Sequence, residues 1–309
     1  MEWISSIAWW AWVLIFLGVV GIRDIFFNKK HTITSNFPIV GHIRYMLEKF
    51  GPEIRQYFVA NNREELPFNR SERSWIYSSS KKQNNYQGFG SDMDFYAPNY
   101  HFIKSDMMSF RLDESHINFK EPSFLPGAKV MGQFNQRKRP FRPKSIINVS
   151  SMSFGSLSAP VISALNQGCL QSGSFHNTGE GGYSMYHDHG ADVVFQFGTG
   201  YFGVRTKDDN LDYNKLEKLV ESNPSIRAIE IKLSQGAKPG KGGVLPASKI
   251  SKEISEIRGV PMGKDVLSPS YHKAFTNVPE LLETIEKIGD KTGLPVGIKA
   301  AIGKTEMWE

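Results

Sequence analysis

The chain has 309 residues, of which 40% are hydrophobic and 22% charged, a balance typical of globular proteins with a sizeable core. Its net charge of +6 is spread along the chain and forms no long basic run, which argues against a nucleic-acid-binding arm. A single cysteine, Cys169, excludes an intramolecular disulfide and argues against a cysteine-ligated zinc site or iron–sulfur cluster. We therefore expect a reduced, cytosol-facing protein without a nucleic-acid partner, in which Cys169 is a small core residue of a helix.

The amino-terminal segment predicts a membrane-spanning helix. Residues 4–22 contain no charged side chain, and a helix needs about 20 apolar residues to cross a bilayer. Tryptophans gather at its start, and basic residues follow its end at Arg23, Lys29 and Lys30. A secretory signal peptide has the opposite charge order and a small-residue cleavage site, so a buried core helix is the main alternative. We expect a single-pass membrane protein whose carboxyl-terminal domain lies in the cytoplasm, with the lipid bilayer as a partner.

Residues 31–145 are predicted as a mixed region between the membrane segment and the main domain. Apolar residues between 43 and 58 recur at helical spacing. Residues 70–135 are rich in Ser, Asn, Tyr, Gly and Pro, which predicts short strands and long loops. The basic, proline-broken stretch 136–145 is the predicted boundary, so the main domain is expected over residues 146–309.

The main domain shows an alternation of strand and helix patterns. Strands are predicted at 146–155, 175–182, 192–200, 226–236 and 294–303. Helices are predicted at 158–173, 213–224, 247–259 and 277–293. In the first of these helices, we expect Ser158 to cap the amino end and Pro160 to occupy the first turn. One face of that helix is expected to carry Val161, Leu165 and Cys169.

Alternating strands and helices predict parallel strands with helical crossovers, as in a doubly wound sheet or a (β/α)₈ barrel. Polar residues alternate with apolar ones in the strands, as Glu230 and Lys232 do with Ile229 and Ile231. Near the mouth of a barrel such polar side chains face a ligand, and no G-x-G-x-x-G follows the first strand, so we predict the barrel. The chain holds about five of the eight strands of such a barrel, and we expect the barrel to be incomplete in this chain.

The loop after one predicted strand is a candidate ligand site. The stretch IEIKLSQGAKPGKGG, residues 229–243, carries glycines that allow close backbone approach, together with Lys232 and Lys238. It lacks the G-K-[ST] ending of a Walker A loop. An anionic or electron-accepting ligand and a solvated flexible loop are both compatible with this spacing.

Two further stretches carry side chains with chemical potential. Glu180, between glycines in NTGEGGY, is placed to pair with Lys232 or to orient an amine, and a plain loop carboxylate is the alternative. His187 and His189 stand two residues apart, but no third ligand has suitable spacing, so we expect no metal site. No Ser-His-Asp or Cys-His constellation is evident.

These motifs together resemble a known family. MSFGSLS, NTGEGG, IEIKLSQGAKPGKGG and LPVGIKAAIGKTEMWE are similar to the FMN-binding synthase domain of glutamate synthase over about residues 146–309. The stretches NFPIVGHIRYMLEKFGPEIRQYF and PFNRSERSWIY resemble the leader of family proteins that carry an amino-terminal membrane segment.

The resemblance implies a TIM barrel that binds FMN and passes a hydride to 2-iminoglutarate, formed from 2-oxoglutarate and ammonia. It implies that Glu180 and Lys232 are catalytic and that Lys238 and Arg258 bind the substrate. The FMN-binding residues that it implies are Met152, Ser153, Gln235 and Lys299. An electron-donor protein or a pyridine nucleotide is the implied source of electrons.

Several family features are not matched in this chain. The amino-terminal catalytic cysteine of the amidotransferase domain, the iron–sulfur cysteines and the glycine-rich FMN-phosphate site of the second half of the barrel have no counterpart here. Two alternatives therefore stand beside the glutamate synthase interpretation. One is a different FMN-barrel oxidoreductase that acts on another amino or hydroxy acid, and the other is a truncated, non-catalytic, membrane-tethered fragment.

Overall fold

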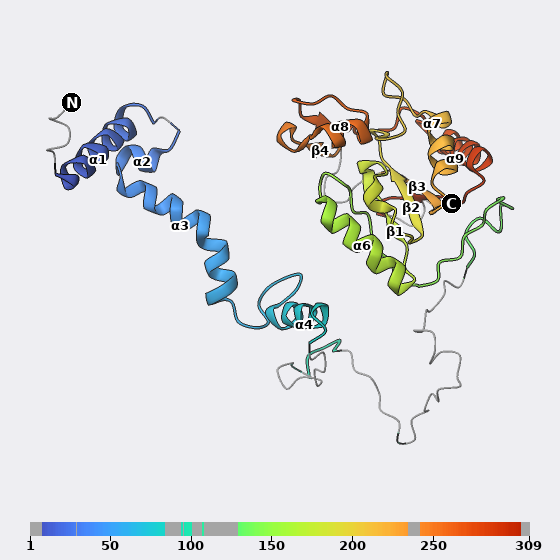
Figure 1. Cartoon of the computed structure of the whole chain (residues 1–309), viewed down its shortest axis with the longest axis horizontal. Coiled ribbons are helices and arrows are strands. Elements are labelled where there is room, and N and C mark those ends of the chain that lie inside the picture. Colours follow the sequence, from blue (N-terminus) through green and yellow to red (C-terminus); the bar gives the residue numbers. More distant parts are fainter. Residues whose placement is uncertain are drawn as a thin grey trace. The chain divides into compact units, whose positions relative to one another are not determined.

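The structure is a computed structural model that describes residues 8–28, 30–83, 94, 96–100, 107, 129–233 and 242–303. The chain divides into two compact units, Met1–Asp106 and Met107–Glu309 (Figure 1). The predicted main domain, residues 146–309, lies within the second unit.

The described part of the first unit is helical. Its helices are α1 (Trp9–Phe26), α2 (Thr32–Asn36), α3 (Val40–Ile54), the π-helix η1 (Arg55–Val59) and α4 (Arg70–Ser80). The amino end of α4 is closed by a capping box, in which Asn69 and Glu72 each accept a hydrogen bond from the backbone N–H of the other.

Helix α1 is long and apolar enough to cross a membrane, with a mean hydropathy of 1.6 over 18 residues of which 6% are buried. A membrane anchor and a signal sequence share this property. The helix covers most of the predicted span 4–22 and continues past it to Phe26, while residues 1–7 lie outside the described part. Because its side chains are exposed almost throughout, α1 is not the core helix of its own unit.

The second unit is built on a four-stranded parallel sheet in the order β1-β2-β3-β6, whose strands are β1 (His176–Asn177), β2 (Val193–Phe197), β3 (Ile226–Lys232) and β6 (Val296–Lys299). Parallel bridging between Val149 and His176 extends the order by one position beyond β1. The unit is therefore α/β with a parallel sheet, as predicted, and the predicted strand 146–155 joins this sheet through the Val149–His176 bridge instead of a continuous strand.

Helices cover one face of this sheet. Apolar side chains of β2 and β3, such as Phe195, Ile229 and Ile231, pack with α7 (Tyr213–Ser222) and α9 (Val278–Thr292). Both helices start at capped ends, since Asp212 and Asn277 accept hydrogen bonds from backbone N–H groups of the first turns. The alternation in the sequence thus places the isoleucines against helices and leaves Glu230 and Lys232 on the other face.

Helix α6 (Ala159–Ser172) buries a face that differs from the predicted one by one residue. Ile162, Asn166 and Cys169 are buried, whereas Val161 is exposed. The reason is polar: the Asn166 amide lies 3.5 Å from His176 Nδ1 and accepts a hydrogen bond from the backbone N–H of His189, so it must point inward. Ser158 is the N-cap residue, but its side chain makes no capping hydrogen bond.

The predicted helix 247–259 is shorter than expected. A 3₁₀ turn, η4 (Ala247–Lys249), precedes α8 (Lys252–Arg258), which ends at Gly259 in the left-handed region, with φ of 68°. A short antiparallel pair, β4 (Val244–Leu245) with β5 (Val266–Leu267), flanks it. Ile250 and Ile254 pack in a second apolar cluster with Phe154, Ile162 and Phe202.

The amino-terminal end of the sheet is closed by residues 131–141. Met131 and Phe141 form an antiparallel bridge, and Phe141 packs on Val194 and Ala228. Arg137 holds this segment to α9 through ion pairs with Glu286 and Asp290, at 2.7 and 3.0 Å. Apolar side chains therefore fill one end of the helix-free face, and the polar side chains lie toward the carboxyl ends of the strands.

Candidate active site

Polar side chains from four neighbouring strands gather on the face of the sheet opposite α7 and α9. Gln196 of β2 lies beside Glu230 of β3 in the strand register, and Lys232 lies beside Lys299 of β6. Asn177 of β1 joins them by donating a 2.9 Å hydrogen bond to Glu230. The carboxyl ends of parallel strands are where α/β proteins place their ligands, so this row is the candidate site.

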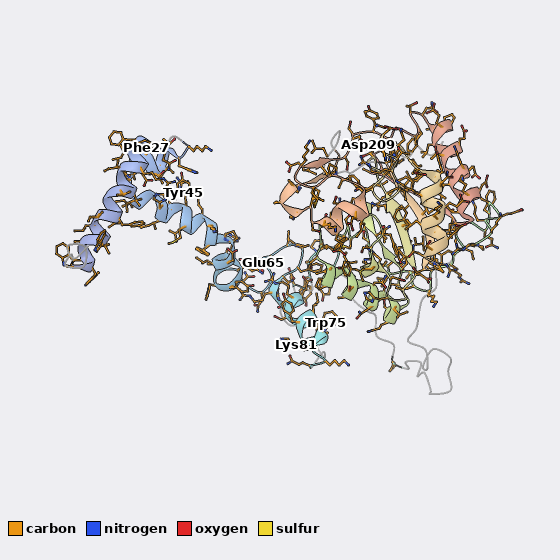
Figure 2. All side chains as sticks on the ribbon, turned by 45° about the horizontal axis from the view of Figure 1, so that its top comes forward. Phe27, Tyr45, Glu65, Trp75, Lys81 and Asp209 are labelled. Atoms are coloured by element: carbon orange, nitrogen blue, oxygen red, sulfur yellow. The ribbon has the colours of Figure 1, made fainter. Side chains whose placement is uncertain are left out.

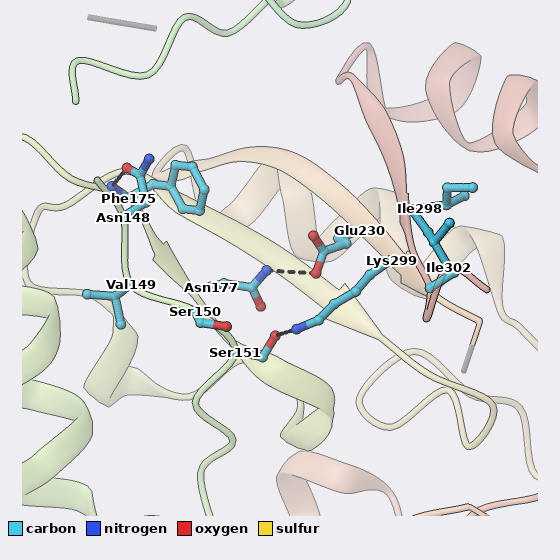
Figure 3. Close-up of a pocket in the computed structure, with 11 residues that line it drawn as sticks. Asn148, Val149, Ser150, Ser151, Phe175, Asn177, Glu230, Ile298, Lys299 and Ile302 are labelled. Atoms are coloured by element: carbon cyan, nitrogen blue, oxygen red, sulfur yellow. Dashed lines mark hydrogen bonds between the residues drawn. The ribbon is translucent and has the colours of Figure 1, made fainter. Parts of the chain in front are cut away.

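Ser151 connects two members of the row, Lys299 and Gln196, and Figure 3 shows its contact with Lys299. Lys299 Nζ donates to Ser151 Oγ, and Ser151 Oγ donates to Gln196 Oε1, both at 2.5 Å. Gln196 is fully buried, and within the described part of the chain its Nε2 has no hydrogen-bond partner. A buried amide donor without a partner costs free energy, so this NH₂ group marks a place where a ligand acceptor fits.

A cavity of about 390 Å³ opens beside this chain of hydrogen bonds (Figure 3). Its polar wall includes Ser151, Asn177, Glu230 and Lys299, and Ile298 and Ile302 contribute to its apolar wall. A mixture of apolar surface and a few convergent polar groups at this size is typical of small-molecule and cofactor sites.

A second cavity, of about 220 Å³, also touches Ser151 and Gln196. An ion pair between Lys232 Nζ and Glu180 Oε1 lies in its wall, with the two side chains 15% and 18% exposed. Ser151 lines both cavities and is hydrogen-bonded to Gln196 of the second, so we treat the two cavities as neighbouring parts of one candidate site.

Glycines place Glu180 against the segment that follows residue 150. The backbone N–H of Glu180 donates a 3.0 Å hydrogen bond to Ser153 Oγ. Gly179 has φ of 62°, and a Cβ there would lie 2.5 Å from Ser153 Oγ, while a Cβ on Gly181 would lie 2.7 Å from the Phe154 carbonyl oxygen. Only glycine allows this close approach, which explains the glycine-rich sequence around the carboxylate.

Arg258 reaches the second cavity from the end of α8. It is 5% exposed, and its guanidinium donates a 2.7 Å hydrogen bond to the Phe154 carbonyl and lies 5.4 Å from the Phe202 ring centre. Burial lowers the pKa of Arg258, and the negative charge of Glu180 opposes this shift. The guanidinium remains charged, because arginine does not lose its proton in proteins.

A buried histidine supports the backbone of Lys232. His272 Nε2 lies 2.9 Å from the Lys232 carbonyl oxygen, and His272 Nδ1 lies 3.1 Å from the Tyr201 hydroxyl. A carbonyl only accepts, so Nε2 carries the proton and Nδ1 accepts from Tyr201. The same hydroxyl accepts a 3.1 Å hydrogen bond from the Ala274 N–H. Burial lowers the pKa of His272, consistent with this neutral form.

The structure brings most of the predicted site residues together. Ser153, Glu180, Lys232 and Arg258 line the second cavity, and the pairing of Glu180 with Lys232 that we considered is present. Lys299 lines the first cavity. Met152 is the exception, since it packs against the apolar cluster of Phe154. Gln235 and Lys238 lie outside the described residues.

Sequence reasoning did not single out Ser151, Gln196 or His272 as site residues. Gln196 left a signal, because it is the one polar residue within the apolar strand VVFQF. The contacts of Ser151 and His272 gave no signal in the sequence, because their partners Gln196 and Lys232 lie 45 and 40 residues away along the chain. No group of three or more metal-ligating side chains is present among the described residues, and His187 instead packs beside His176.

Comparison with known proteins then identifies the family. A family model described as the conserved region in glutamate synthase matches residues 99–307. The chain belongs to the glutamate synthase family. The match covers every residue of the candidate active site, so this site lies within the glutamate synthase-like region.

Three relatives illustrate the extent of the similarity. The glutamate synthase large subunit-like protein YerD of Bacillus subtilis (strain 168) is 36% identical over 96% of this chain and 63% of its own length. The archaeal-type glutamate synthase (NADPH) of Thermotoga sp. (strain RQ2) is 37% identical over 49% of this chain and 28% of its own. A glutamate synthase large subunit-like protein of Rhizobium meliloti (strain 1021) is 32% identical over 54% and 35%. The chain thus spans under two thirds of each of these relatives.

Proposed function

We propose that this chain contributes the first part of a TIM-type barrel that binds FMN and reductively aminates 2-oxoglutarate to glutamate. The observation that carries the proposal is the arrangement of Glu180, Lys232, Gln196 and Lys299 around two cavities that share Ser151, in a chain of the glutamate synthase family. The parallel order of β1, β2, β3 and β6, with polar side chains at their carboxyl ends, supports the barrel.

The residues of the first cavity fit a flavin. Lys299 in its wall offers a positive charge that favours the reduced, anionic ring, and the unpartnered Nε2 of Gln196, which lines the neighbouring cavity and is linked to the first through Ser151, offers a donor to a ring carbonyl. Ser153 and the backbone beside it line the neighbouring wall. When bound, FMN supplies the hydride for reduction of an imine carbon.

The residues of the second cavity suit a dicarboxylate and its imine. Lys232 and Arg258 bring positive charge to a space where a carboxylate can bind, and the Arg258 guanidinium has an Nε without a partner among the described residues. Glu180 holds a cationic nitrogen, which in the structure is Lys232 Nζ and in the reaction is the imine nitrogen. His272 fixes the Lys232 backbone and with it the origin of that side chain.

We also propose that α1 anchors the protein in a membrane, with the second unit in the cytoplasm. Its apolar length and exposed side chains support a spanning helix, and Arg23 and Lys30 at its carboxyl end support this orientation. A pyridine nucleotide is the proposed source of electrons, in line with the name of the Thermotoga relative, an archaeal-type glutamate synthase (NADPH).

Formation of labelled glutamate tests the reaction. Detergent-purified chain is supplied with FMN, dithionite, 2-oxoglutarate and ¹⁵N-ammonium, and ¹⁵N-glutamate is measured by mass spectrometry. We expect Lys232→Met to lower the rate by at least about 100-fold, as removal of a positioned charge at a reacting centre does. Lys252→Met on exposed α8 serves as the control and is expected to retain the wild-type rate.

Two results would oppose the proposal. One is an unchanged rate in the Lys232→Met variant, which would place the chemistry elsewhere. The other is a chain that holds FMN but forms product only from a different oxo acid, which would favour another amino or hydroxy acid as the substrate.

A further inference from the structure

The first unit carries an amphipathic helix with an exposed apolar stripe. In α3, apolar side chains recur every three or four residues at Val40, Ile43, Leu47, Phe50 and Ile54. This spacing places them on one side of a helix. The charged residues of the helix occupy the remaining positions, as the exposed pair Arg44–Glu48 at 3.0 Å shows. Ile43, Leu47 and Phe50 are each more than 50% exposed, so in the structure the stripe is not covered.

A fixed elbow joins this helix to α1. Asp24, near the end of α1 and fully buried, accepts hydrogen bonds from the Ile39 N–H at 3.1 Å and from His42 Nε2 at 2.8 Å. Asn28 donates a 2.9 Å hydrogen bond to Thr34 Oγ1 in the connection. Gly41 packs closely on α2, since a Cβ there would lie 2.9 Å from Thr34 Cα. These contacts set the direction in which α3 leaves α1.

That direction is crosswise. Figures 1 and 2 show α3 leaving the carboxyl end of α1 at a steep angle instead of folding back along it, with Tyr45 marking α3 in Figure 2. A helix that crosses a spanning helix at the end of its apolar stretch lies along the plane of the membrane surface. An amphipathic helix with a single apolar face suits this interface.

We propose that α3 lies in the cytoplasmic interface of the bilayer that α1 spans, with its apolar stripe turned into the lipid. The proposal rests on the membrane anchorage proposed above. Three observations select lipid as the partner: continuity with α1, the crosswise elbow, and the exposed aromatic residues Phe50, Tyr57 and Phe58 along and after the stripe. A coiled coil with a second copy is less suited, because α3 has 15 residues and a stable heptad seam needs about three to four heptads.

Depth-dependent fluorescence quenching tests this orientation. In a Cys169→Ser background of the full chain, single cysteines at Leu47 and Phe50 on the stripe, and at Glu48 and Glu53 on the polar side, carry a bimane label. A label at Phe16, in the middle of α1, is the internal reference. The chains are reconstituted into phosphatidylcholine–phosphatidylglycerol vesicles that contain lipids brominated near the headgroup or near the chain end.

We expect headgroup-proximal bromines to quench the labels at positions 47 and 50 at least about twofold more than those at 48 and 53, because a helix buries only one face in the interface. The label at position 16 is expected to respond to the deeper bromines. Equal quenching at the stripe positions and at the polar positions would overturn the interfacial position, while the label at position 16 still reports anchorage. Labels on the stripe that are quenched only when a second labelled copy of the chain is present would overturn it as well. If position 16 is not quenched by either lipid, the anchorage fails and the inference fails with it.

Discussion

The Glu180–Lys232 ion pair connects two segments that are 52 residues apart in the sequence. Each side chain is mostly buried, so loss of either partner leaves a charge in a poorly solvated place. The alternation of residues in β3 predicted that Lys232 faces away from the helices, and the glycines around Glu180 predicted a close backbone approach. The distance between the two charges followed only from the fold.

A double-mutant cycle measures this contact. We expect Glu180→Gln and Lys232→Met each to destabilise the protein and the double variant to lose less than their sum, with a coupling of about 1–3 kcal/mol. Urea unfolding followed by circular dichroism gives the free energies. The exposed pair Lys252–Glu256 on α8, at 4.0 Å, is the matched control and is expected to be additive. Additivity at positions 180 and 232 would contradict the pairing.

The hydroxyl of Tyr201 offers a test of the support beneath Lys232. Tyr201→Phe leaves the Ala274 N–H and His272 Nδ1 without their partner, and we expect a loss of about 1–3 kcal/mol in unfolding free energy. Tyr271→Phe, at a residue that is 68% exposed, is expected to change little. Equal stability of the Tyr201→Phe variant and the wild type would show that the hydroxyl does not hold this network.

At the scale of elements, the spacing of apolar residues and the capping residues predicted the helices well wherever apolar side chains alone determine which face is buried. Helix α9 is an example, with Leu281, Ile285 and Ile288 directed inward and Gly293 at its end. Helix α6 is the counterexample, because the buried Asn166 cannot be recognised from hydrophobic spacing. The shortening of the predicted strand 146–155 to a bridge at Val149 was likewise not evident from the local pattern.

The turn that carries Glu180 provides a prediction at this scale. Gly181→Ala forces a Cβ toward the Phe154 backbone, so we expect a loss of about 1–3 kcal/mol and weaker function of the site. Gly168→Ala, in α6 with open space around it, is the opposite case and should stabilise the protein by about 0.5–1 kcal/mol through the helix preference of alanine. Similar changes in stability in the Gly181→Ala and Gly168→Ala variants would mean that the turn accommodates a Cβ without moving Glu180.

At the scale of the whole molecule, two buried histidines couple the stability of the second unit to pH. Burial lowers the pKa of His176 to about 4, and burial together with the charge of His176 lowers that of His187 to about 4. In the unfolded chain both protonate near the ordinary value of 6.5. Neutral histidines therefore favour the folded form fully above pH 6.5, and this contribution is lost as the pH falls toward 4.

We expect the unfolding free energy to fall over this window by about 1 kcal/mol per pH unit for each histidine. Urea unfolding between pH 7 and pH 4 measures the slope. His176→Phe removes one of the two groups and is expected to flatten it. If the His176→Phe variant keeps the wild-type slope of unfolding free energy against pH, the loss of stability in acid comes from carboxylates instead.

The central claim is that the polar row at the strand ends is a flavin site of the glutamate synthase family. The most direct measurement is the visible absorbance of the detergent-purified chain after addition of FMN and gel filtration, compared with the Gln196→Leu, Lys299→Met and Lys252→Met variants. We predict that flavin bands elute with the wild type and Lys252→Met and are lost from the two site variants. A folded wild-type chain that leaves all the FMN free, or site variants that retain it fully, would contradict the account.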